Sequence, residues 1–361
     1  MEEVRVKVGQ DGYSIYIGQH TLAQLGSLMG RNGLTGKALV LTDAQVGALY
    51  GEQVLGILAE AGFTAELFAV PSGEDSKSLA VAETVFSKAI TMGLDRKSVI
   101  VALGGGVVGD LAGFIAATYL RGIPFVQVPT TLLAQVDSSV GGKVAVNHAL
   151  GKNLIGAFYQ PRLVLIDIAL LQSLPERELA SGLAEVIKYG IIEDADLFSY
   201  LQKNSRPVLA KEPEALQHII KRSCEIKAGI VEQDEKENSL RMILNFGHTM
   251  GHAVEADTGF GLYSHGESVA IGMAGAASLS AALGLCSQET VDTIRCIITQ
   301  YKLPLGAPEC TAERLLPFLV RDKKAVGGKI HWVLVRSIGS VLIKDDVAPM
   351  TVDEILQEIT C

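Results

Sequence analysis

Residues 98–120 read Ser-Val-Ile-Val-Ala-Leu-Gly-Gly-Gly-Val-Val-Gly-Asp-Leu-Ala-Gly-Phe-Ile-Ala-Ala-Thr-Tyr-Leu, and this stretch decides the fold class. The apolar run 98–103 predicts a buried strand, and the pattern from Leu111 to Leu120 predicts a helix. Glycines between the two allow a close backbone turn, and the N–H groups that open a helix favour an anion. This order of elements is typical of a nucleotide-binding α/β domain.

Further strands and helices extend this pattern on both sides. Apolar runs at 38–42, 66–70, 124–128 and 163–166 have the length of strands, and helical patterns lie at 44–61 and 78–92. Strands that alternate with helices at this spacing indicate a parallel sheet. We therefore predict a Rossmann-like α/β domain over residues 1–175.

The pattern changes after Pro175. Long amphipathic stretches follow at 176–203, 213–233, 239–257, 266–283 and 288–302, and a late strand pair is expected at 330–335 and 340–344, with turns at Gly327-Gly328 and Gly339. These stretches predict a mostly α-helical domain over residues 176–361. Because no low-complexity linker separates the two domains, we expect the active site in a cleft between them.

Composition narrows the class of protein. The 361 residues are 48% hydrophobic and carry a net charge of −9, which argues against a nucleic-acid partner. No apolar run reaches the roughly 18 residues of a membrane helix, and the start Met-Glu-Glu-Val-Arg does not have the pattern of a secretory signal. Five cysteines without a C-x-x-C pair are expected to be reduced thiols. These features predict a cytoplasmic protein without a membrane partner.

The glycine turn has two interpretations. Gly104, Gly106 and Gly109 fit G-x-G-x-x-G, but Pro124 stands where the usual fingerprint has an acidic ribose ligand about 20 residues later. A turn that only packs helix against strand is the alternative, and Asp110 favours a ligand site. Asp43, Glu74 and Lys77 also follow predicted strands, although a surface turn would tolerate them too.

A second polar segment runs from Gln127 to Lys143 as Gln-Val-Pro-Thr-Thr-Leu-Leu-Ala-Gln-Val-Asp-Ser-Ser-Val-Gly-Gly-Lys, and Gly151-Lys-Asn153 follows it. A packed core does not need this density of charge, and buried charges must be paired with one another or with charged ligands. We interpret the segment as an anion and cofactor site.

Four residues suggest a metal site. His248 and His252 are four residues apart on one predicted helix face, and His265 and Glu185 lie in other charge-rich motifs. Catalytic zinc usually has three protein ligands and one open position, so one of the four has another role. The spacing does not choose between His248 and His252.

Basic residues lie in or beside these motifs. Arg241 comes four residues before Asn245 and is expected on the same helix face, whereas Lys227 and Lys324, taken singly, fit a solvated face equally well. A substrate with both phosphate and carboxylate groups would require about this much positive charge. The set comprises Arg121, Lys143, Lys152, Lys188, Lys227, Arg241, Lys323 and Lys324.

The chain closely resembles 3-dehydroquinate synthase, a family of the sugar-phosphate cyclase group. The matching segments are Glu74–Lys77, Gly104–Asp110, Arg121-Gly122, Val128–Lys143, Gly151–Asn153, Glu185–Gly190, Asn245–Thr249 and Asp322–Lys324. One departure is Val144, where the family often has Thr, and we expect it to have no catalytic consequence.

The resemblance implies an NAD⁺- and metal-dependent carbon–oxygen lyase, with Zn²⁺ as the usual metal and Co²⁺ as an alternative. Such an enzyme converts 3-deoxy-arabino-heptulosonate 7-phosphate into 3-dehydroquinate and phosphate in the shikimate pathway, which leads to aromatic amino acids. The steps are oxidation, phosphate elimination, reduction, ring opening and an intramolecular aldol closure. The resemblance also implies a homodimer that associates through the first domain.

Site residues follow from the same resemblance. The metal ligands would be Glu185, His248 and His265, which leaves His252 for the substrate or a proton relay. The nucleotide would contact Asp43, Glu74, Lys77, Gly105, Gly106, Val107, Asp110, Thr130, Thr131, Lys143 and Lys152. The substrate would contact Asp137, Lys143, Asn153, Lys188, Lys227, Arg241, Asn245, His252 and one or both of Lys323 and Lys324. Catalytic roles would fall to Arg121, Asp137, Lys143, Lys152, Asn153, Lys188 and His252.

Three other functions compete with this one. A metal-dependent polyol dehydrogenase would have a similar two-domain plan, but it has little use for so many basic residues. Sister cyclases for other sugar phosphates would share the metal and nucleotide sites, and Asp137–Lys143 with Lys188-Tyr-Gly190 favours the dehydroquinate assignment. An inactive NAD-binding regulator would be expected to have lost some of these residues.

Overall fold

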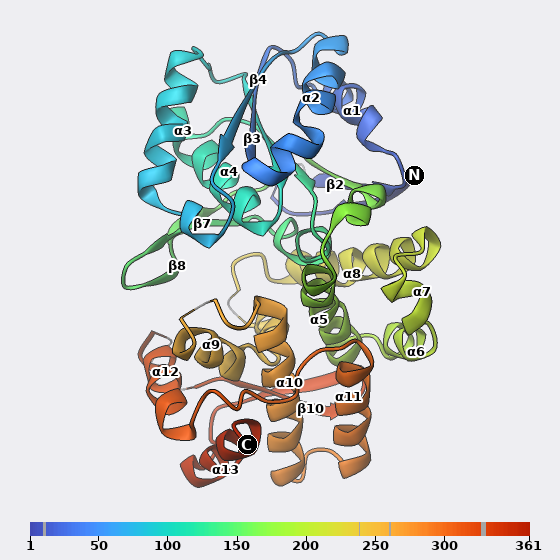
Figure 1. Ribbon diagram of the computed structural model, residues 1–361, viewed down its shortest axis with the longest axis vertical. Helices are drawn as coiled ribbons and strands as arrows, with labels where there is room; N and C mark the ends of the chain where they lie inside the picture. The colour runs from blue at the N-terminus through green and yellow to red at the C-terminus, as the bar shows by residue number, and fades with distance from the viewer. Residues whose placement is uncertain (10–11, 238, 260, 326–329) are drawn as a thin grey trace. The chain divides into compact units, whose positions relative to one another are not determined.

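The computed structural model describes residues 1–9, 12–237, 239–259, 261–325 and 330–361, without the side chains of 320–325 (Figure 1). The chain forms two compact units. The first contains Met1–Leu174 and Leu216–Lys236, and the second contains Pro175–Ala215 and Glu237–Cys361. A segment from the second half of the sequence thus belongs to the first unit, although the predicted boundary assigned it to the second domain.

A seven-stranded sheet organises the first unit, and its strand order is β1-β2-β9-β6-β5-β3-β4. Every neighbouring pair is parallel except β1 and β2. The strands are β1 (Glu2–Val6), β2 (Tyr13–Gly18), β3 (Lys37–Asp43), β4 (Thr64–Val70), β5 (Val99–Gly104), β6 (Phe125–Pro129) and β9 (Leu163–Asp167). The five predicted strands are confirmed, whereas β1 and β2 were not predicted.

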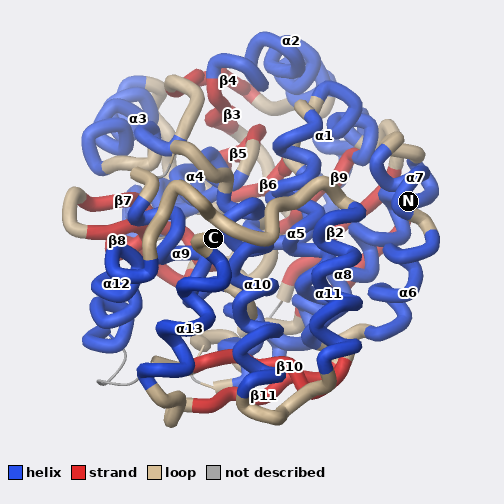
Figure 2. Tube along the Cα trace, turned by 60° about the horizontal axis from the view of Figure 1, so that its bottom comes forward, coloured by secondary structure: helices blue, strands red, loops and turns tan. Residues whose placement is uncertain are grey.

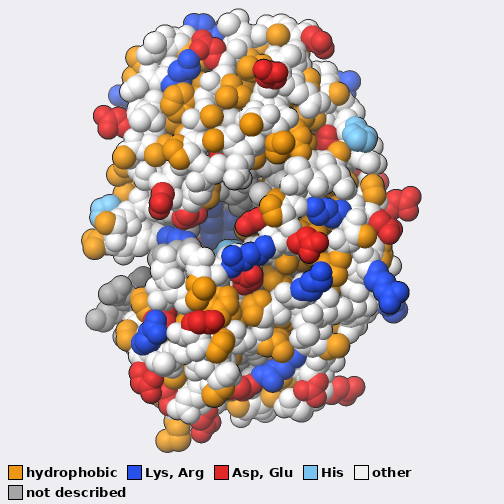
Figure 3. Space-filling model, in the orientation of Figure 1, with side chains coloured by type: hydrophobic (Ala, Val, Ile, Leu, Met, Phe, Trp, Pro, Cys, Tyr) orange, Lys and Arg blue, Asp and Glu red, His pale blue; other side chains and the backbone are white. Residues whose placement is uncertain are grey.

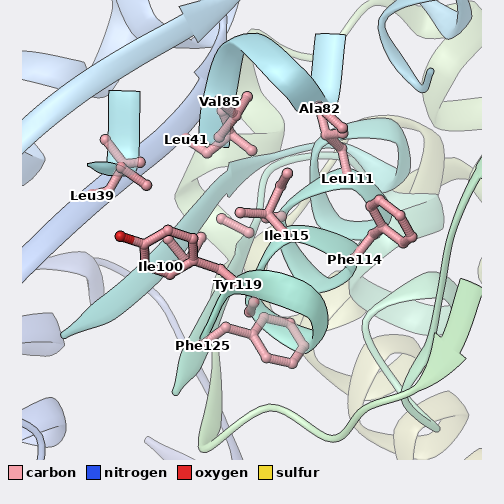
Figure 4. Close-up of a cluster of buried hydrophobic side chains, with 14 of the residues drawn as sticks. Leu39, Leu41, Ala82, Val85, Ile100, Leu111, Phe114, Ile115, Tyr119 and Phe125 are labelled. Carbon is pink, nitrogen blue, oxygen red and sulfur yellow. The ribbon is translucent and has the colours of Figure 1, made fainter. Parts of the chain in front are cut away.

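Helices pack on both faces of this sheet because its strands are apolar on both faces. Leu39 and Leu41 of β3 pack with α3 (Leu79–Thr91) and α4 (Gly106–Thr118), in the core shown in Figure 4. Ala38 and Val40, which alternate with them, pack with α1 (Leu25–Arg31) and α2 (Ala44–Glu60). Each large buried side chain of this kind stabilises the fold by about 1.5–3 kcal/mol.

The strand order reverses beside β3. The chain passes outward from β3 to β4, crosses back to β5 on the other side of β3, and continues to β6. In open α/β sheets, ligands bind beyond the carboxyl ends of strands at such a point. Asp43 at the end of β3 and the glycines after β5 occupy these ends.

Two further elements complete the first unit. The strands β7 (Lys143–His148) and β8 (Gly151–Phe158) form an antiparallel hairpin, and α8 (Pro213–Gln233) contributes its residues from Leu216 onward. The hairpin was not predicted, because its glycines and charges conceal the short apolar alternation of Val144 and Val146.

The second unit is mostly helical, with one strand pair (Figure 2). Its helices are α5 (Glu176–Ile192), α6 (Ala195–Lys203), α7 (Ser205–Leu209), α9 (His248–Asp257), α10 (His265–Ala282), α11 (Gln288–Gln300), α12 (Ala312–Ala325) and α13 (Pro349–Ile359). The strands β10 (Trp332–Ser337) and β11 (Ser340–Lys344) form the predicted hairpin around Gly339, whereas Gly327-Gly328 lies outside the described residues. The predicted fold class is confirmed.

Two predicted helices are interrupted. The stretch 176–203 is split where Asp194 caps the start of α6, and its Oδ1 accepts from the N–H groups of Asp196 and Leu197. The stretch 239–257 begins as a 3-10 helix, Leu240–Asn245, and becomes α-helical only after Gly247, whose φ is +80°. The helices α12 and α13 were not predicted.

The surface carries charges of both signs. On the face shown in Figure 3, acidic and basic side chains are interspersed among apolar ones. Among the described helices, none combines the length and the apolarity that crossing a bilayer requires.

Candidate functional site

The predicted metal ligands come together in the second unit. Oε1 of Glu185, on α5, lies 3.7 Å from Nε2 of His248 and 3.7 Å from Nε2 of His265. This oxygen is buried and accepts no hydrogen bond from the described residues. Ligand atoms on one tetrahedral zinc ion are about 3.5 Å apart, given bonds of about 2.0–2.2 Å. The buried oxygen and the two nitrogens therefore fit a divalent metal.

Glycines allow the three helices to meet closely. A Cβ on Gly266 would lie 2.1 Å from the carbonyl oxygen of Ser181, and one on Gly272 would lie 1.8 Å from the carbonyl oxygen of Gly247. The Gly266 N–H also donates to Oγ of Ser181 at 3.0 Å. These contacts hold the start of α10 against α5 and α9, which brings His265 to Glu185.

The environment of His248 suits a metal ligand. Its Nδ1 lies 3.2 Å from the carbonyl oxygen of Phe246, so a proton on Nδ1 leaves Nε2 available. Burial lowers the pKa of His248 well below its ordinary value, and the positive charge of Lys188 lowers it further. The imidazole is therefore neutral, as a metal ligand must be.

His252 lies one turn further along α9 and is exposed. Its ring centroid is 5.2 Å from that of His248 and 6.1 Å from that of His265. It falls in a different group, in which ligand atoms of His252, Glu255 and His265 lie within 4.8 Å of one another. The two histidines thus fall in two candidate groups that share His265, and the choice of His248 as the metal ligand stays a prediction.

Three other predicted substrate residues also lie in the second unit. Lys188 is buried and forms an ion pair with Oε2 of Glu185. Arg241 is also buried, and Nδ2 of Asn245 lies 3.4 Å from Oε1 of Glu237. The expectation that Arg241 and Asn245 share an α-helical face was wrong, because a 3-10 helix aligns residues three apart. The side chains of Lys323 and Lys324 lie outside the described residues.

The glycine turn lies at the carboxyl end of β5 in the first unit. The helix α4 begins at Gly106, earlier than the predicted Leu111, so Gly106 and Val107 lie in its first turn. Gly105 precedes it without a side-chain cap, and a Cβ there would lie 3.1 Å from Cγ2 of Thr131. The N-cap residue thus supplies no side-chain hydrogen bond to the opening N–H groups of α4, and such groups suit an anion.

Lys77 and Asp110 form the charged centre of the first unit. The Lys77 ammonium pairs with Asp110 and donates to Oδ1 of Asn153 at 2.5 Å. Burial raises the pKa of Asp110, and the positive charge of Lys77 opposes that rise. The structure thus joins three predicted site residues from three separate segments.

Asn147 is a residue that the sequence analysis missed. Its Nδ2 donates to Oε1 of Glu74 at 2.7 Å, and its Oδ1 accepts from the Asn153 N–H at 3.0 Å. Nζ of Lys152 also lies 4.0 Å from Oε1 of Glu74. Asn147 therefore links the turn of Glu74 to the hairpin that carries Lys152. Its place between two site motifs, 143 and 151–153, was the available clue.

Other predicted site residues of the first unit differ in their burial and in their hydrogen-bond partners. Asp43 caps α2 and also accepts from Oγ of Ser72 at 3.0 Å. Oγ1 of Thr130 is buried and has no hydrogen-bond partner among the described residues. Asp137 pairs with Lys227 at 2.6 Å. Arg121 is exposed in a left-handed turn, with φ of +68°. The predicted cleft between domains stays a prediction.

Solved structures share this fold over nearly the whole chain. The 2-epi-5-epi-valiolone synthase from Streptomyces hygroscopicus subsp. jinggangensis, solved with NAD⁺ and Zn²⁺ bound, superposes with a TM-score of 0.90 at 28% identity, covering 98% of each chain. A 2-deoxy-scyllo-inosose synthase complexed with carbaglucose-6-phosphate, NAD⁺ and Co²⁺ also gives 0.90, at 25% identity, and covers 99% of this chain and 100% of its own. The fold is therefore that of the sugar-phosphate cyclases.

Sequence similarity narrows this class to one family. Residues 67–181 match the model of the 3-dehydroquinate synthase N-terminal region, and residues 182–325 match that of the C-terminal region. A 3-dehydroquinate synthase from Desulforamulus reducens is 49% identical over 359 residues, which cover 99% of this chain and 100% of the relative. The chain belongs to the 3-dehydroquinate synthase family.

Proposed function

We propose that this protein catalyses the 3-dehydroquinate synthase reaction, the conversion of 3-deoxy-arabino-heptulosonate 7-phosphate into 3-dehydroquinate and phosphate. It is thus a carbon–oxygen lyase of the shikimate pathway. The observation that carries the proposal is Oε1 of Glu185, which is buried without a hydrogen bond at 3.7 Å from two histidine nitrogens, in a chain of this family.

NAD⁺ and a divalent metal, Zn²⁺ or Co²⁺, are the cofactors. When bound, they supply reversible hydride acceptance and Lewis acidity. Glu185, His248 and His265 would hold the metal. The nucleotide would lie against the first turn of α4 and the Lys77–Asp110 centre. Its proposed contacts are Asp43, Glu74, Lys77, Gly105, Gly106, Val107, Asp110, Thr130, Thr131, Lys143 and Lys152.

Basic residues would bind the anionic groups of the substrate. Buried Lys188 and Arg241 provide fixed positive charge, and the pairing of Lys227 with Asp137 orients the Lys227 ammonium. Charge-assisted hydrogen bonds of this kind are the strong ones. Asn153, Asn245 and Lys143 complete the proposed contacts, together with one or both of Lys323 and Lys324.

Phosphate elimination needs positive charge that stabilises the departing group. We assign this role to Arg121, Lys143, Lys152 and Lys188, with Asn153 as a hydrogen-bond donor. His252 is exposed beside the predicted metal ligands, with its ring centroid 5.2 Å from that of His248, and we assign it the transfer of a proton to or from bound substrate.

The test is an assay of phosphate release from 3-deoxy-arabino-heptulosonate 7-phosphate with catalytic NAD⁺, with NADH absorbance followed in parallel. We expect many turnovers of phosphate without net NADH, loss of activity on chelation, and recovery with Zn²⁺. Sustained NADH formation without phosphate would instead identify a dehydrogenase. Absence of both phosphate release and NADH formation would contradict the assignment, and other sugar phosphates would then be assayed.

We further infer a homodimer in the cytoplasm. The first unit exposes Leu150, Leu154 and Phe158 on the β7–β8 hairpin, with relative exposures of 82%, 67% and 46%. Exposed apolar groups of this size favour a protein interface. The free cysteines suit a reducing compartment. Light scattering should give twice the chain mass, and Leu154→Asp should shift the protein toward monomer. A monomeric parent protein would contradict the dimer.

A further inference from the structure

Glu255 lies beside the metal cluster, and nothing proposed so far uses it. Its side chain is 8% exposed, and its Oε2 lies 3.4 Å from Nδ1 of His265. On α9 it follows His252 by three residues and His248 by seven, so the three share one helix face. Burying a carboxylate is costly unless it is paired and hydrogen-bonded, so the partner of Glu255 matters.

The two nitrogens of His265 face two different carboxylates. Nδ1 faces Glu255, and Nε2 lies 3.7 Å from Oε1 of Glu185. A neutral imidazole carries one proton, so donation from Nδ1 leaves the lone pair on Nε2. The Phe246 carbonyl does the same for His248. A carboxylate is the stronger acceptor of the two, and it also makes the imidazole a better electron donor.

We propose that Glu255 is a positioning residue that accepts the Nδ1–H of His265 and thereby fixes the ring with Nε2 toward the metal. The proposal rests on the proposed function, since it requires Glu185, His248 and His265 to hold the ion. It assigns Glu255 an effect on metal affinity that acts through His265, without contact between Glu255 and the metal or the substrate.

The number of metal ions bound per chain distinguishes this role from an alternative one. His252, Glu255 and His265 have ligand atoms within 4.8 Å of one another and could form a second metal site. Both groups share His265, so ions in both at once would require this imidazole to lose both ring protons. A positioning role therefore predicts one metal per chain, whereas the second site predicts two.

The experiment compares the full-length wild type with Glu255→Gln and Asp257→Asn. Each protein is stripped of metal, and its Zn²⁺ affinity is measured by competition with a chromophoric chelator. Asp257 is the matched control, because it is on the same helix and its side chain is 6% exposed, but its carboxylate pairs with Arg314. We expect Zn²⁺ binding by Glu255→Gln to weaken about 10- to 100-fold, and Asp257→Asn to keep the wild-type affinity.

A spectroscopic measurement supports the comparison. Co²⁺ in place of Zn²⁺ reports ligand geometry through its visible absorption, which should change in Glu255→Gln and remain unchanged in Asp257→Asn. If Glu255→Gln does not fold, Glu255→Asp keeps the charge on a shorter side chain and should show a smaller loss of affinity.

Several outcomes would overturn the proposal. Wild-type affinity in a folded Glu255 variant would show that the contact does not matter. Equal weakening in Glu255→Gln and Asp257→Asn would indicate a general effect on α9. Two Zn²⁺ ions per wild-type chain, with one lost in Glu255→Gln, would make Glu255 a ligand. A wild-type chain that binds no Zn²⁺ would overturn the proposed function as well, whereas the other outcomes overturn only the role proposed for Glu255.

Discussion

Single side chains determine how the metal cluster works. Glu185 divides its two oxygens between Lys188 and the two histidine nitrogens, so one carboxylate neutralises a buried ammonium and would also provide a ligand atom to the proposed metal. Buried ion pairs of this kind are costly when one partner is removed, by about 3–5 kcal/mol. The residues of the cluster are therefore coupled in stability as well as in chemistry.

Substitution by alanine should distinguish the role of His265 from that of His252. His265→Ala removes one of three ligands and is expected to abolish metal retention after dialysis. His252→Ala should retain the metal and lose turnover by about 10²–10⁴-fold, because it removes a proton-transfer group. Elemental analysis and phosphate release measure the two effects. Equal metal loss in both variants would contradict this division of roles.

Glu267 should give the second unit a defined acid sensitivity. Burial acts to raise the pKa of Glu267, but hydrogen bonds from Arg177 and from the Ser264 N–H outweigh it and lower the pKa below the ordinary 4.5. A lowered folded-state pKa contributes stability above the unfolded value, and this stability is lost as the pH falls through the folded value.

Glu267→Gln should therefore reduce the free energy of unfolding by about 1 kcal/mol at pH 7, since it weakens the cap of α10. The difference from wild type should shrink as the pH falls below about 4.5. Urea unfolding at pH 7, 5 and 4 measures it. A difference that stays constant with pH would show that the carboxylate charge has no part in it.

Among the elements, those with one strong pattern were predictable from the sequence. The strands β3, β5, β6 and β9 are apolar runs because both of their faces are buried, whereas in the edge strand β4 only Val70 is buried and the apolar run is shorter. The edge strand β1 was missed because it mixes charged and apolar residues over only five positions, and its neighbour β2 was missed with it. Long-range contacts such as those of Asn147 leave no periodic pattern. Glu255 was predictable, since it continues the i, i+4, i+7 face of His248 and His252.

The close approach of α10 to α9 should be sensitive to a single methyl group. Gly272→Ala places a Cβ 1.8 Å from the Gly247 carbonyl oxygen, and backbone cannot yield as a side chain can. We expect a loss of about 2–4 kcal/mol in unfolding free energy and weaker metal binding.

Gly56→Ala is the control for helix propensity. Gly56 is exposed in α2, with no atom within 4 Å of an added Cβ, so the substitution should stabilise by about 0.5–1 kcal/mol. Urea unfolding measures both variants. If Gly272→Ala matched Gly56→Ala, the packing of α10 would not depend on this contact.

At the scale of the whole molecule, the two predicted cofactors belong to different units. Zn²⁺ should protect backbone amides of α5, α9 and α10 from hydrogen exchange, and NAD⁺ should protect those of residues 104–110 and 74–77. Each ligand at 100 times its Kd adds about 2.7 kcal/mol to the stability of the state that binds it. Hydrogen exchange with mass spectrometry, with each cofactor added alone, measures the pattern. Identical protection by both would contradict separate binding sites.

The segment Leu216–Lys236 has a consequence for the order in which the chain folds. It supplies Lys227 to Asp137, Cys224 Sγ to the carbonyl oxygen of Gln135, and Lys221 to Glu2. The last strand of the seven-stranded sheet ends at Asp167, and synthesis must add a further 54 to 60 residues before Lys221, Cys224 and Lys227 exist. During synthesis, the first unit therefore cannot complete its contacts until α5, α6 and α7 of the second unit have been made. A protease cut or gene fusion point near residue 175 would separate a sheet from the helix that completes it.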